Sequence, residues 1–306
     1  MVSRSIRPLS RGECFLFFQG EIKMRKKKQR NIIILSIAVV LIAVVSWFSF
    51  GPKPANSEAE KTVTVGIVGA SKGDIKIWQS VAKRAKKDYG IIVKTRSFDG
   101  YDQPDKALKS GDIDLNAFQH YAFLKEWNKA NKGGITAIGD TYIAPIRLYS
   151  KKYKKLSSLP DNATIVVPND PTNESRALFV LKNAGLIKLR KGKTLVSVAD
   201  ITSNPRNFKI KEVASEQTSR VINDVDAAVV NNDFAGPAGL GEKQTIYVEP
   251  LNKDSKQWVN IICARTKDKN KKIYREVVKA YQTEATKKLY KQFYGNKQIP
   301  AWDKKF

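Results

Sequence analysis

The sequence predicts an α/β protein whose two lobes share a cleft, preceded by an apolar N-terminal helix. Three observations lead to this fold class. Short β-branched runs alternate with amphipathic segments from residue 62 onward, residues 32–50 carry no charge, and no flexible linker interrupts the chain after residue 61. Repeated β–α alternation is typical of α/β folds with parallel sheets. At roughly 100–200 residues per domain, a chain of 306 residues has room for two such units.

The predicted strands and helices follow each other in a regular order. Residues 62–68 are short and β-branched and predict the first strand, whereas residues 75–89 carry Ile77, Trp78 and Val81 at helical spacing. Further strands are expected at 91–95, 113–118, 164–167, 208–213, 227–230 and 245–248, and further helices at 104–110, 175–184, 216–222 and 272–293.

The N-terminal part predicts a membrane-targeting segment. Residues 32–50 form an uncharged apolar run, and a helix of that length approaches the roughly 30 Å hydrocarbon thickness of a bilayer. Basic residues beside an apolar segment tend to remain in the cytoplasm. The basic stretch at 25–30 therefore predicts that the N-terminal side of the segment is cytoplasmic. We therefore expect residues 24–50 to be a basic collar and a transmembrane or signal helix, followed by a linker at 51–61. The rest of the chain is expected on the extracytoplasmic face of the bacterial cell membrane, anchored by residues 32–50 or released after cleavage.

The first 23 residues are unusual ahead of such a segment. Met24 followed by RKKKQR is a normal beginning for a targeting sequence, and the codons for Gly20 and Glu21 can spell a ribosome-binding site just upstream. We expect residues 1–23 to be an untranslated or disordered extension. A lipid-anchored protein would carry a cysteine just after the apolar run, but the two cysteines are Cys14 and Cys263. Cys263 lies in an apolar run and is expected to be a small core residue.

The net charge of +26, from 55 Lys and Arg against 29 Asp and Glu, first suggests nucleic acid as a partner. An extracytoplasmic domain does not meet chromosomal DNA, however. The lysines are also spread over helix faces such as 83–87 and 287–291 instead of being interleaved with aromatic residues. We therefore expect no nucleic-acid partner, and expect contacts with anionic lipid headgroups and envelope polymers.

The residue types argue against an enzyme. Two cysteines and a single histidine, His120, cannot supply a four-ligand zinc site or a His-rich metal site. His120 is the only imidazole base available to a catalytic triad, and no G-x-S-x-G elbow accompanies it. Walker A and G-x-G-x-x-G motifs are also missing from the sequence. We expect no catalysis, no cofactor and no metal.

Three polar segments follow predicted strands, where α/β folds place their ligand-binding loops. They read NAFQH at 116–120, PNDPTNESRAL at 168–178 and VVNNDFA at 229–235. In the second segment Thr172 or Asn173 can cap the next helix, and Arg176 falls in its predicted first turn. A helix N-terminus beside an arginine suits a carboxylate ligand. The alternative is a well-capped helix with a solvated arginine.

These segments, with LYSKK at 148–152 and VDAAVVNNDFA at 225–235 before Ala238-Gly239-Leu240, closely resemble the NlpA/MetQ family. The family comprises substrate-binding proteins of bacterial methionine-type ABC importers. The resemblance runs from about residue 62 to Trp302. It implies a two-lobed periplasmic-binding-protein fold (type II-like) that closes around an amino acid. Residues 62–144 and 239–306 would form lobe 1, residues 145–238 would form lobe 2, and two chain crossings would form the hinge.

The resemblance also implies a set of ligand-binding residues. Arg176 would pair with the ligand's α-carboxylate, Asn231 would hold its polar backbone end, and Phe118 and His120 would enclose its side chain. Tyr121, Asn173 and Tyr149 complete the expected set. For His120 a purely structural role is an open alternative. The implied ligand is methionine or a related amino acid, and the implied partners are an ABC permease and its ATPase.

Two departures from the family pattern bear on the ligand. Ile146-Arg147 stands where many relatives have a methionine and a small residue, and Asn231-Asn232-Asp233-Phe234 replaces a common Asn-Thr-Asn-Tyr. The additional Arg147 and Asp233 could alter selectivity. A different amino acid or a short peptide is therefore an alternative ligand. A basic cell-surface or wall-binding protein is the alternative function.

Overall fold

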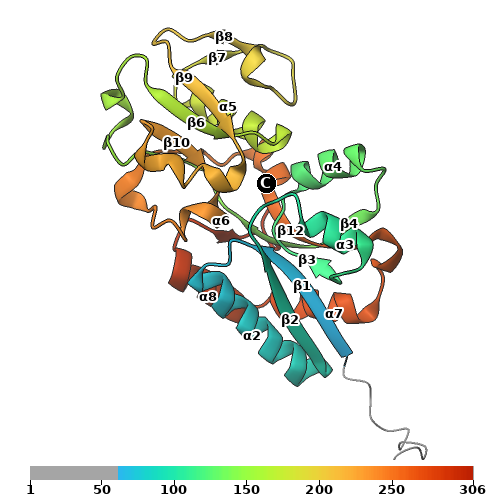
Figure 1. Ribbon diagram of the computed structural model, residues 1–306. Helices are drawn as coiled ribbons and strands as arrows, with labels where there is room; N and C mark the ends of the chain where they lie inside the picture. Colours follow the sequence, from blue (N-terminus) through green and yellow to red (C-terminus); the bar gives the residue numbers. More distant parts are fainter. Residues whose placement is uncertain (1–60, 306) are drawn as a thin grey trace, which may run out of the picture. The chain divides into compact units, whose positions relative to one another are not determined.

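The computed structural model describes residues 61–305, which form a mixed α/β fold around two main sheets (Figure 1). The segments expected at 1–23, 24–50 and most of 51–61 lie outside the described residues. Within residues 61–305, no helix combines the length and the apolar character needed to cross a membrane.

The first sheet has six strands in the order β13-β4-β12-β3-β1-β2. Strand β1 pairs in parallel with β2 and β3, whereas β12 is antiparallel to β3 and β4, and β13 is antiparallel to β4. The expected parallel pairing is thus present but incomplete, because the returning C-terminal strand β12 inserts antiparallel between β3 and β4. The bounds are β1 Lys61–Val68, β2 Ile91–Phe98, β3 Leu115–Asn116, β4 Ile135–Ile143, β12 Val259–Arg265 and β13 Ile299–Pro300.

The second sheet has five strands in the order β11-β5-β10-β6-β9, with a separate β7-β8 pair beside it. Strand β6 is parallel to β9 and β10, and β5 is antiparallel to β10 and β11. The bounds are β5 Arg147–Tyr149, β6 Thr164–Pro168, β7 Lys188–Leu189, β8 Ile201–Ser203, β9 Lys209–Val213, β10 Ala227–Val230 and β11 Thr245–Val248.

The chain passes twice between the two sheets, once between β4 and β5 and once between β11 and β12. We call residues 61–144 and 249–305 lobe 1, and residues 145–248 lobe 2. Strand β11 pairs with β5 and so belongs to the second sheet, which places the second crossing after residue 248 and not after residue 238.

Helix α3 has the predicted bounds, whereas local caps shift or divide other predicted helices. Helix α2 begins at Lys72, earlier than predicted, because Ser71 and Asp74 form a capping box. The helix expected at 272–293 is divided, because the Thr283 side chain caps a second helix. The helix expected at 216–222 is only two 3₁₀ turns. The bounds are α2 Lys72–Tyr89, α3 Pro104–Ser110, α4 Tyr121–Ala130, α5 Pro171–Asn183, α6 Asn232–Ala235, α7 Lys272–Tyr281 and α8 Glu284–Tyr294.

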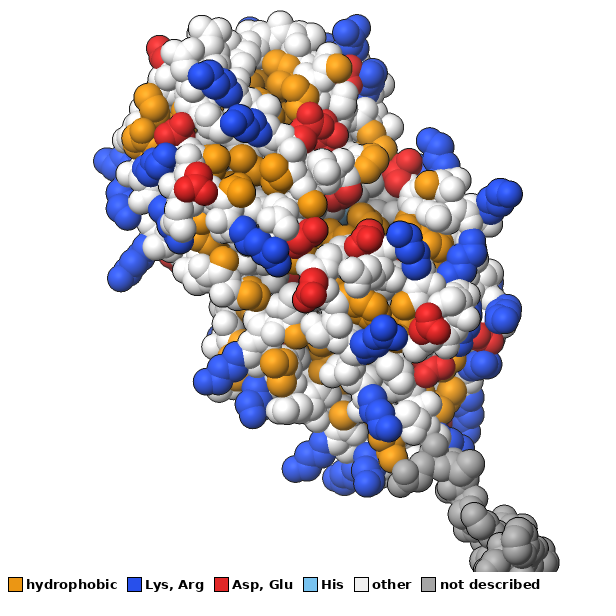
Figure 2. Space-filling view, viewed as in Figure 1, with side chains coloured by type: hydrophobic (Ala, Val, Ile, Leu, Met, Phe, Trp, Pro, Cys, Tyr) orange, Lys and Arg blue, Asp and Glu red, His pale blue; other side chains and the backbone are white. Residues whose placement is uncertain are grey.

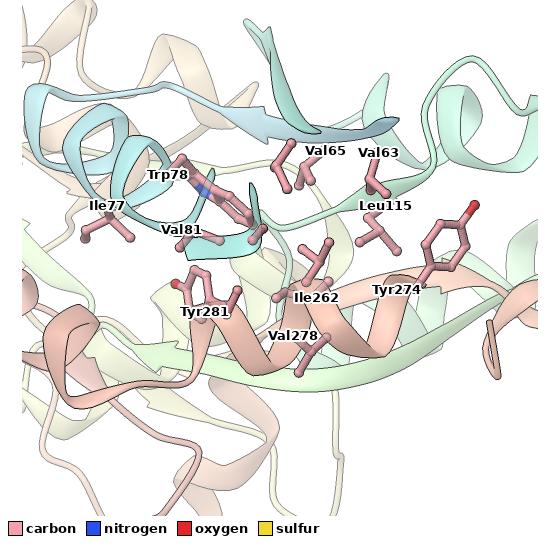
Figure 3. Close-up of a cluster of buried hydrophobic side chains, with 14 of the residues drawn as sticks. Val63, Val65, Ile77, Trp78, Val81, Leu115, Ile262, Tyr274, Val278 and Tyr281 are labelled. Carbon is pink, nitrogen blue, oxygen red and sulfur yellow. The ribbon is translucent and has the colours of Figure 1, made fainter. Parts of the chain in front are cut away.

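The apolar core continues from one lobe to the other. In lobe 1, α2 and α7 cover one face of the six-stranded sheet, where the rings of Trp78 and Tyr281 lie 5.2 Å apart (Figure 3). A second cluster joins the other face to lobe 2 and includes Phe118, Tyr149 and Cys263. Cys263 is fully buried, which confirms its predicted place in the core. Lys and Arg side chains are scattered over the face seen in Figure 2.

Candidate functional site

A cavity lies between the two lobes. About 420 Å³ of space inside its outline is not filled by protein atoms, a volume that includes the solvent at its opening. Most of its polar lining comes from the loops and helix starts that follow β2, β3, β6 and β10, as expected for an α/β fold. Lobe 1 contributes Tyr101, Phe118, Gln119, His120, Phe123, Tyr142, Ala144 and Asn260, and lobe 2 contributes Ile146, Asn173, Arg176, Asn231, Asn232 and Asp233.

Five of the seven residues expected to bind ligand line this cavity, namely Arg176, Asn231, Phe118, His120 and Asn173. The other two, Tyr121 and Tyr149, are not among its lining residues. The Tyr121 hydroxyl donates to Asp140 Oδ1 at 2.5 Å. Tyr149 is 2 % exposed and packs in the apolar cluster that joins the lobes.

Arg176 is held rigidly in the second turn of α5. Asp170, and not Thr172 or Asn173, caps this helix, so Arg176 lies two or three residues further into the helix than the sequence suggests. Its Nε donates to Glu249 Oε1 at 3.0 Å and its Nη2 donates to Glu249 Oε2 at 2.5 Å. The Arg176 side chain is only 4 % exposed, so the alternative of a solvated arginine is wrong. Nη1 makes no hydrogen bond with any residue in 61–305 and remains available to a ligand.

Glu249 connects Arg176 to both chain crossings. Its Oε2 also accepts from the backbone N–H of Ile146 at 3.1 Å, and Arg176 Nη2 donates to the Ala144 carbonyl at 2.9 Å. The guanidinium of Arg176 lies 4.8 Å from the ring centre of Trp258. Glu249 and Trp258 were missed by sequence reasoning, since neither belongs to a motif and both are distant from Arg176 in the chain.

His120 has both a structural and a lining role. Its Nδ1 accepts from the Phe123 backbone N–H at 3.1 Å and so caps α4, which places the ring proton on Nε2. Nε2 faces Asn173 Oδ1 at 3.3 Å. Burial, and then the charge of Arg176, lower the pKa of His120 to about 3. The imidazole is therefore neutral at physiological pH and serves as a fixed hydrogen-bonding wall.

Asn173 orients the polar floor of the cavity. Its Oδ1 also accepts from Asn231 Nδ2 at 2.8 Å, and its own Nδ2 donates to the Asp170 carboxylate at 3.0 Å. This chain of bonds fixes both amides, because each donor has an assigned acceptor. The Oδ1 of Asn231 is buried and has no hydrogen-bond partner among the described residues.

An aromatic wall closes the other side of the cavity. The ring centres of Tyr101, Phe118 and Phe123 lie 5.7–5.9 Å from one another. Such rings suit an apolar or thioether side chain, since sulfur–aromatic contacts contribute roughly 0.3–1.5 kcal/mol. Of the two departures from the family pattern, Ile146 and Asp233 line the cavity, whereas Arg147 does not. Arg147 is buried and donates to the Pro145 carbonyl at 3.1 Å.

Behind the cavity, Asp105 is a buried carboxyl group in lobe 1. Its Oδ1 accepts from Asn116 Nδ2 at 2.7 Å and from Gln119 Nε2 at 2.6 Å, and burial raises its pKa to about 7. The folded pKa thus lies above the unfolded value of roughly 3.9. The folded state binds more protons between these two values, so the free energy of unfolding falls as pH rises through that window, by about 1.4 kcal/mol per pH unit.

Asp105→Asn is expected to remove this penalty, because the amide oxygen still accepts both hydrogen bonds and carries no charge. The free energy of unfolding of the variant should rise relative to wild type between pH 5 and pH 8. Urea unfolding at both pH values measures this difference. Identical pH dependence in the two proteins would show that Asp105 does not titrate in this window.

Comparison with known proteins supports a common origin for this fold and cavity. The profile of the NlpA lipoprotein family matches residues 63–302. The chain belongs to the NlpA lipoprotein family. Within the family it is 39 % identical over 253 residues to the probable D-methionine-binding lipoprotein MetQ of Haemophilus influenzae, covering 82 % of this chain and 91 % of the relative.

Solved structures of the family have the same fold. The substrate-binding protein of a methionine transporter from Streptococcus pneumoniae is 44 % identical, with a TM-score of 0.75 over 79 % of this chain and 96 % of that one. A nutrient-binding protein from Burkholderia cenocepacia, solved bound to methionine, is 40 % identical, with a TM-score of 0.74 over 78 % of this chain and 99 % of that one. The resemblance found in the sequence is therefore confirmed.

Proposed function

We propose that this protein is the substrate-binding component of a methionine-type ABC importer. The observation that carries the proposal is Arg176, a buried and braced guanidinium whose Nη1 is left for a carboxylate inside an interlobe cavity. The aromatic wall of the same cavity fits the methionine side chain. The names of the relatives support the same ligand. In this role the protein binds and delivers its ligand and catalyses no reaction.

The proposed mechanism is capture by closure. An amino acid enters while the lobes are apart, Arg176 takes its carboxylate, and the lobes close at the two crossings near residues 144 and 249. The closed form then docks on a membrane permease driven by an ATPase. Arg176 and Glu249 bond to backbone groups of the first crossing, so ligand capture and hinge geometry act on the same residues.

The proposed place of action is the extracytoplasmic face of the membrane. The family profile and the relatives are named as lipoproteins, which supports this location. Residues 32–50 would anchor this chain, or release it after cleavage.

A thermal-shift panel tests the ligand. The purified protein is expected to be stabilised by methionine, and less by the other amino acids or by methionine-containing dipeptides. A ligand at 100 times its Kd adds about 2.7 kcal/mol to the free energy of unfolding. If another amino acid or a dipeptide stabilises the protein more than methionine does, that compound replaces methionine as the proposed ligand. No response to any of them, together with binding to anionic wall polymers, would overturn the transport function.

A further inference from the structure

Asp233 places a carboxylate in the wall of the cavity. It lies in α6 of lobe 2, and its side chain reaches two tyrosines of lobe 1 that also line the cavity. Tyr101 OH donates to Asp233 Oδ2 at 2.7 Å, and Tyr142 OH contacts Oδ1 at 3.2 Å. The phenols hold the carboxylate in place but supply no positive charge.

No cation among residues 61–305 neutralises this group. None of the Lys and Arg ion pairs within the described chain involves Asp233, and the nearby Asp74 adds a like charge. The one guanidinium in the cavity, Arg176, is already paired with Glu249. A desolvated carboxylate without a cationic partner is costly, so a cationic ligand group beside it is favoured.

A second polar atom points to the same kind of ligand group. Asn231, the N-cap residue of α6, lines the cavity and is 7 % exposed, and its Oδ1 lacks a hydrogen-bond donor among the described residues. Asn231 Oδ1 and the Asp233 carboxylate are both acceptors on residues that line the cavity. An ammonium group has three N–H donors and a positive charge, which matches acceptors of this kind.

We propose that Asp233, assisted by Asn231 Oδ1, binds the α-ammonium group of the ligand and so restricts the cavity to amino acids with a free amino group. This inference rests on the proposed function. Arg176 takes the carboxylate end of the zwitterion and Asp233 takes the ammonium end. Because Asp233 also accepts hydrogen bonds from Tyr101 and Tyr142, the ammonium would bind at a contact between the lobes.

The test compares methionine with 4-(methylthio)butanoate, which has the same chain and carboxylate but no amino group. Binding to the full-length protein is measured by calorimetry at pH 8. Wild type is expected to bind methionine at least about 100-fold more tightly than the analogue, since hydrogen bonds to charged groups are the strong ones. In Asp233→Asn this ratio should fall at least about tenfold, with the affinity for the analogue little changed.

Asp74→Asn is the matched control. Asp74 is another half-buried carboxylate that accepts a hydrogen bond from a tyrosine, Tyr294, and it is not a lining residue of this cavity. The Asp74→Asn variant should have the same ratio of methionine affinity to analogue affinity as wild type. If Asp233→Asn keeps the ratio too, or if both variants lower it equally, the ammonium site is overturned. If wild type binds neither compound nor any other amino acid, the proposed function itself fails.

The wild-type protein gives a second measurement that requires no variant. Burial and Asp74 raise the pKa of Asp233 to about 7. The groups that face it are Tyr101, Tyr142 and Asp74, and desolvation also raises the pKa of Asp74. Methionine affinity is expected to fall at least about threefold more than analogue affinity between pH 8 and pH 5.5, because a protonated Asp233 loses its attraction for an ammonium group. Parallel pH profiles for the two compounds would overturn the proposal.

Discussion

Replacing Arg176 by methionine is expected to lower the affinity for the amino-acid ligand by at least about 100-fold, since truncating one partner of a buried, hydrogen-bonded charge pair costs about 2–5 kcal/mol. The methionine side chain keeps much of the volume of the arginine stem. The effect therefore reports the lost guanidinium and its free Nη1. Calorimetric titration with methionine measures it.

The same change also removes the partner of Glu249, which is 10 % exposed. An unpaired buried carboxylate costs about 3–5 kcal/mol, so the single variant is expected to be less stable as well as inactive. The double variant Arg176→Met with Glu249→Gln should recover much of this stability, because the amide carries no charge. It should still fail to bind. Binding by the double variant at wild-type affinity would show that Arg176 does not hold the ligand.

The sequence predicted the loops of the site better than their internal contacts. PNDPTNESRAL singled out Arg176 and Asn173, which line the interlobe cavity, because a capped helix after a buried strand is a local pattern. Glu249 could not be found in this way, since it lies 73 residues from Arg176 and its role depends on the second crossing. Tyr101 and Tyr142 belong to no motif. Their position follows from the approach of the two lobes.

The errors in the fold have a similar origin. Residues 245–248 do form the predicted strand, but only tertiary pairing assigns β11 to the sheet of lobe 2. The helix predicted at 272–293 is instead two helices, α7 burying Tyr274 and Tyr281 among others, and α8 burying Thr286 and Tyr290. Only the cap at Thr283 marks the break. At 216–222 the helical pattern of apolar residues is short and no side chain caps it, so it does not stabilise an α-helix.

Replacing Gly69 by alanine is expected to prevent the lobes from meeting as they do here. Gly69 directly follows β1 of lobe 1 with φ +63°, and a Cβ there would lie 2.4 Å from the carbonyl oxygen of Asp233 in lobe 2. The neighbour is backbone and cannot rotate away, so this overlap must be relieved by separating the lobes. Because a ligand is enclosed only between lobes in contact, its affinity should fall by at least about tenfold, or about 1.4 kcal/mol.

Gly90→Ala separates this effect from the conformational cost of the substitution itself. Gly90 ends α2 with φ +67°, nearly the same left-handed conformation, but a Cβ at this position meets no atom of the described chain within 4 Å. Both variants bear the roughly 1–2 kcal/mol cost of a left-handed alanine. Only Gly69→Ala should weaken methionine binding and enlarge the radius of gyration of the liganded protein in small-angle scattering. Equal affinities for the two variants would mean that contact between Gly69 and Asp233 is not needed to hold the ligand.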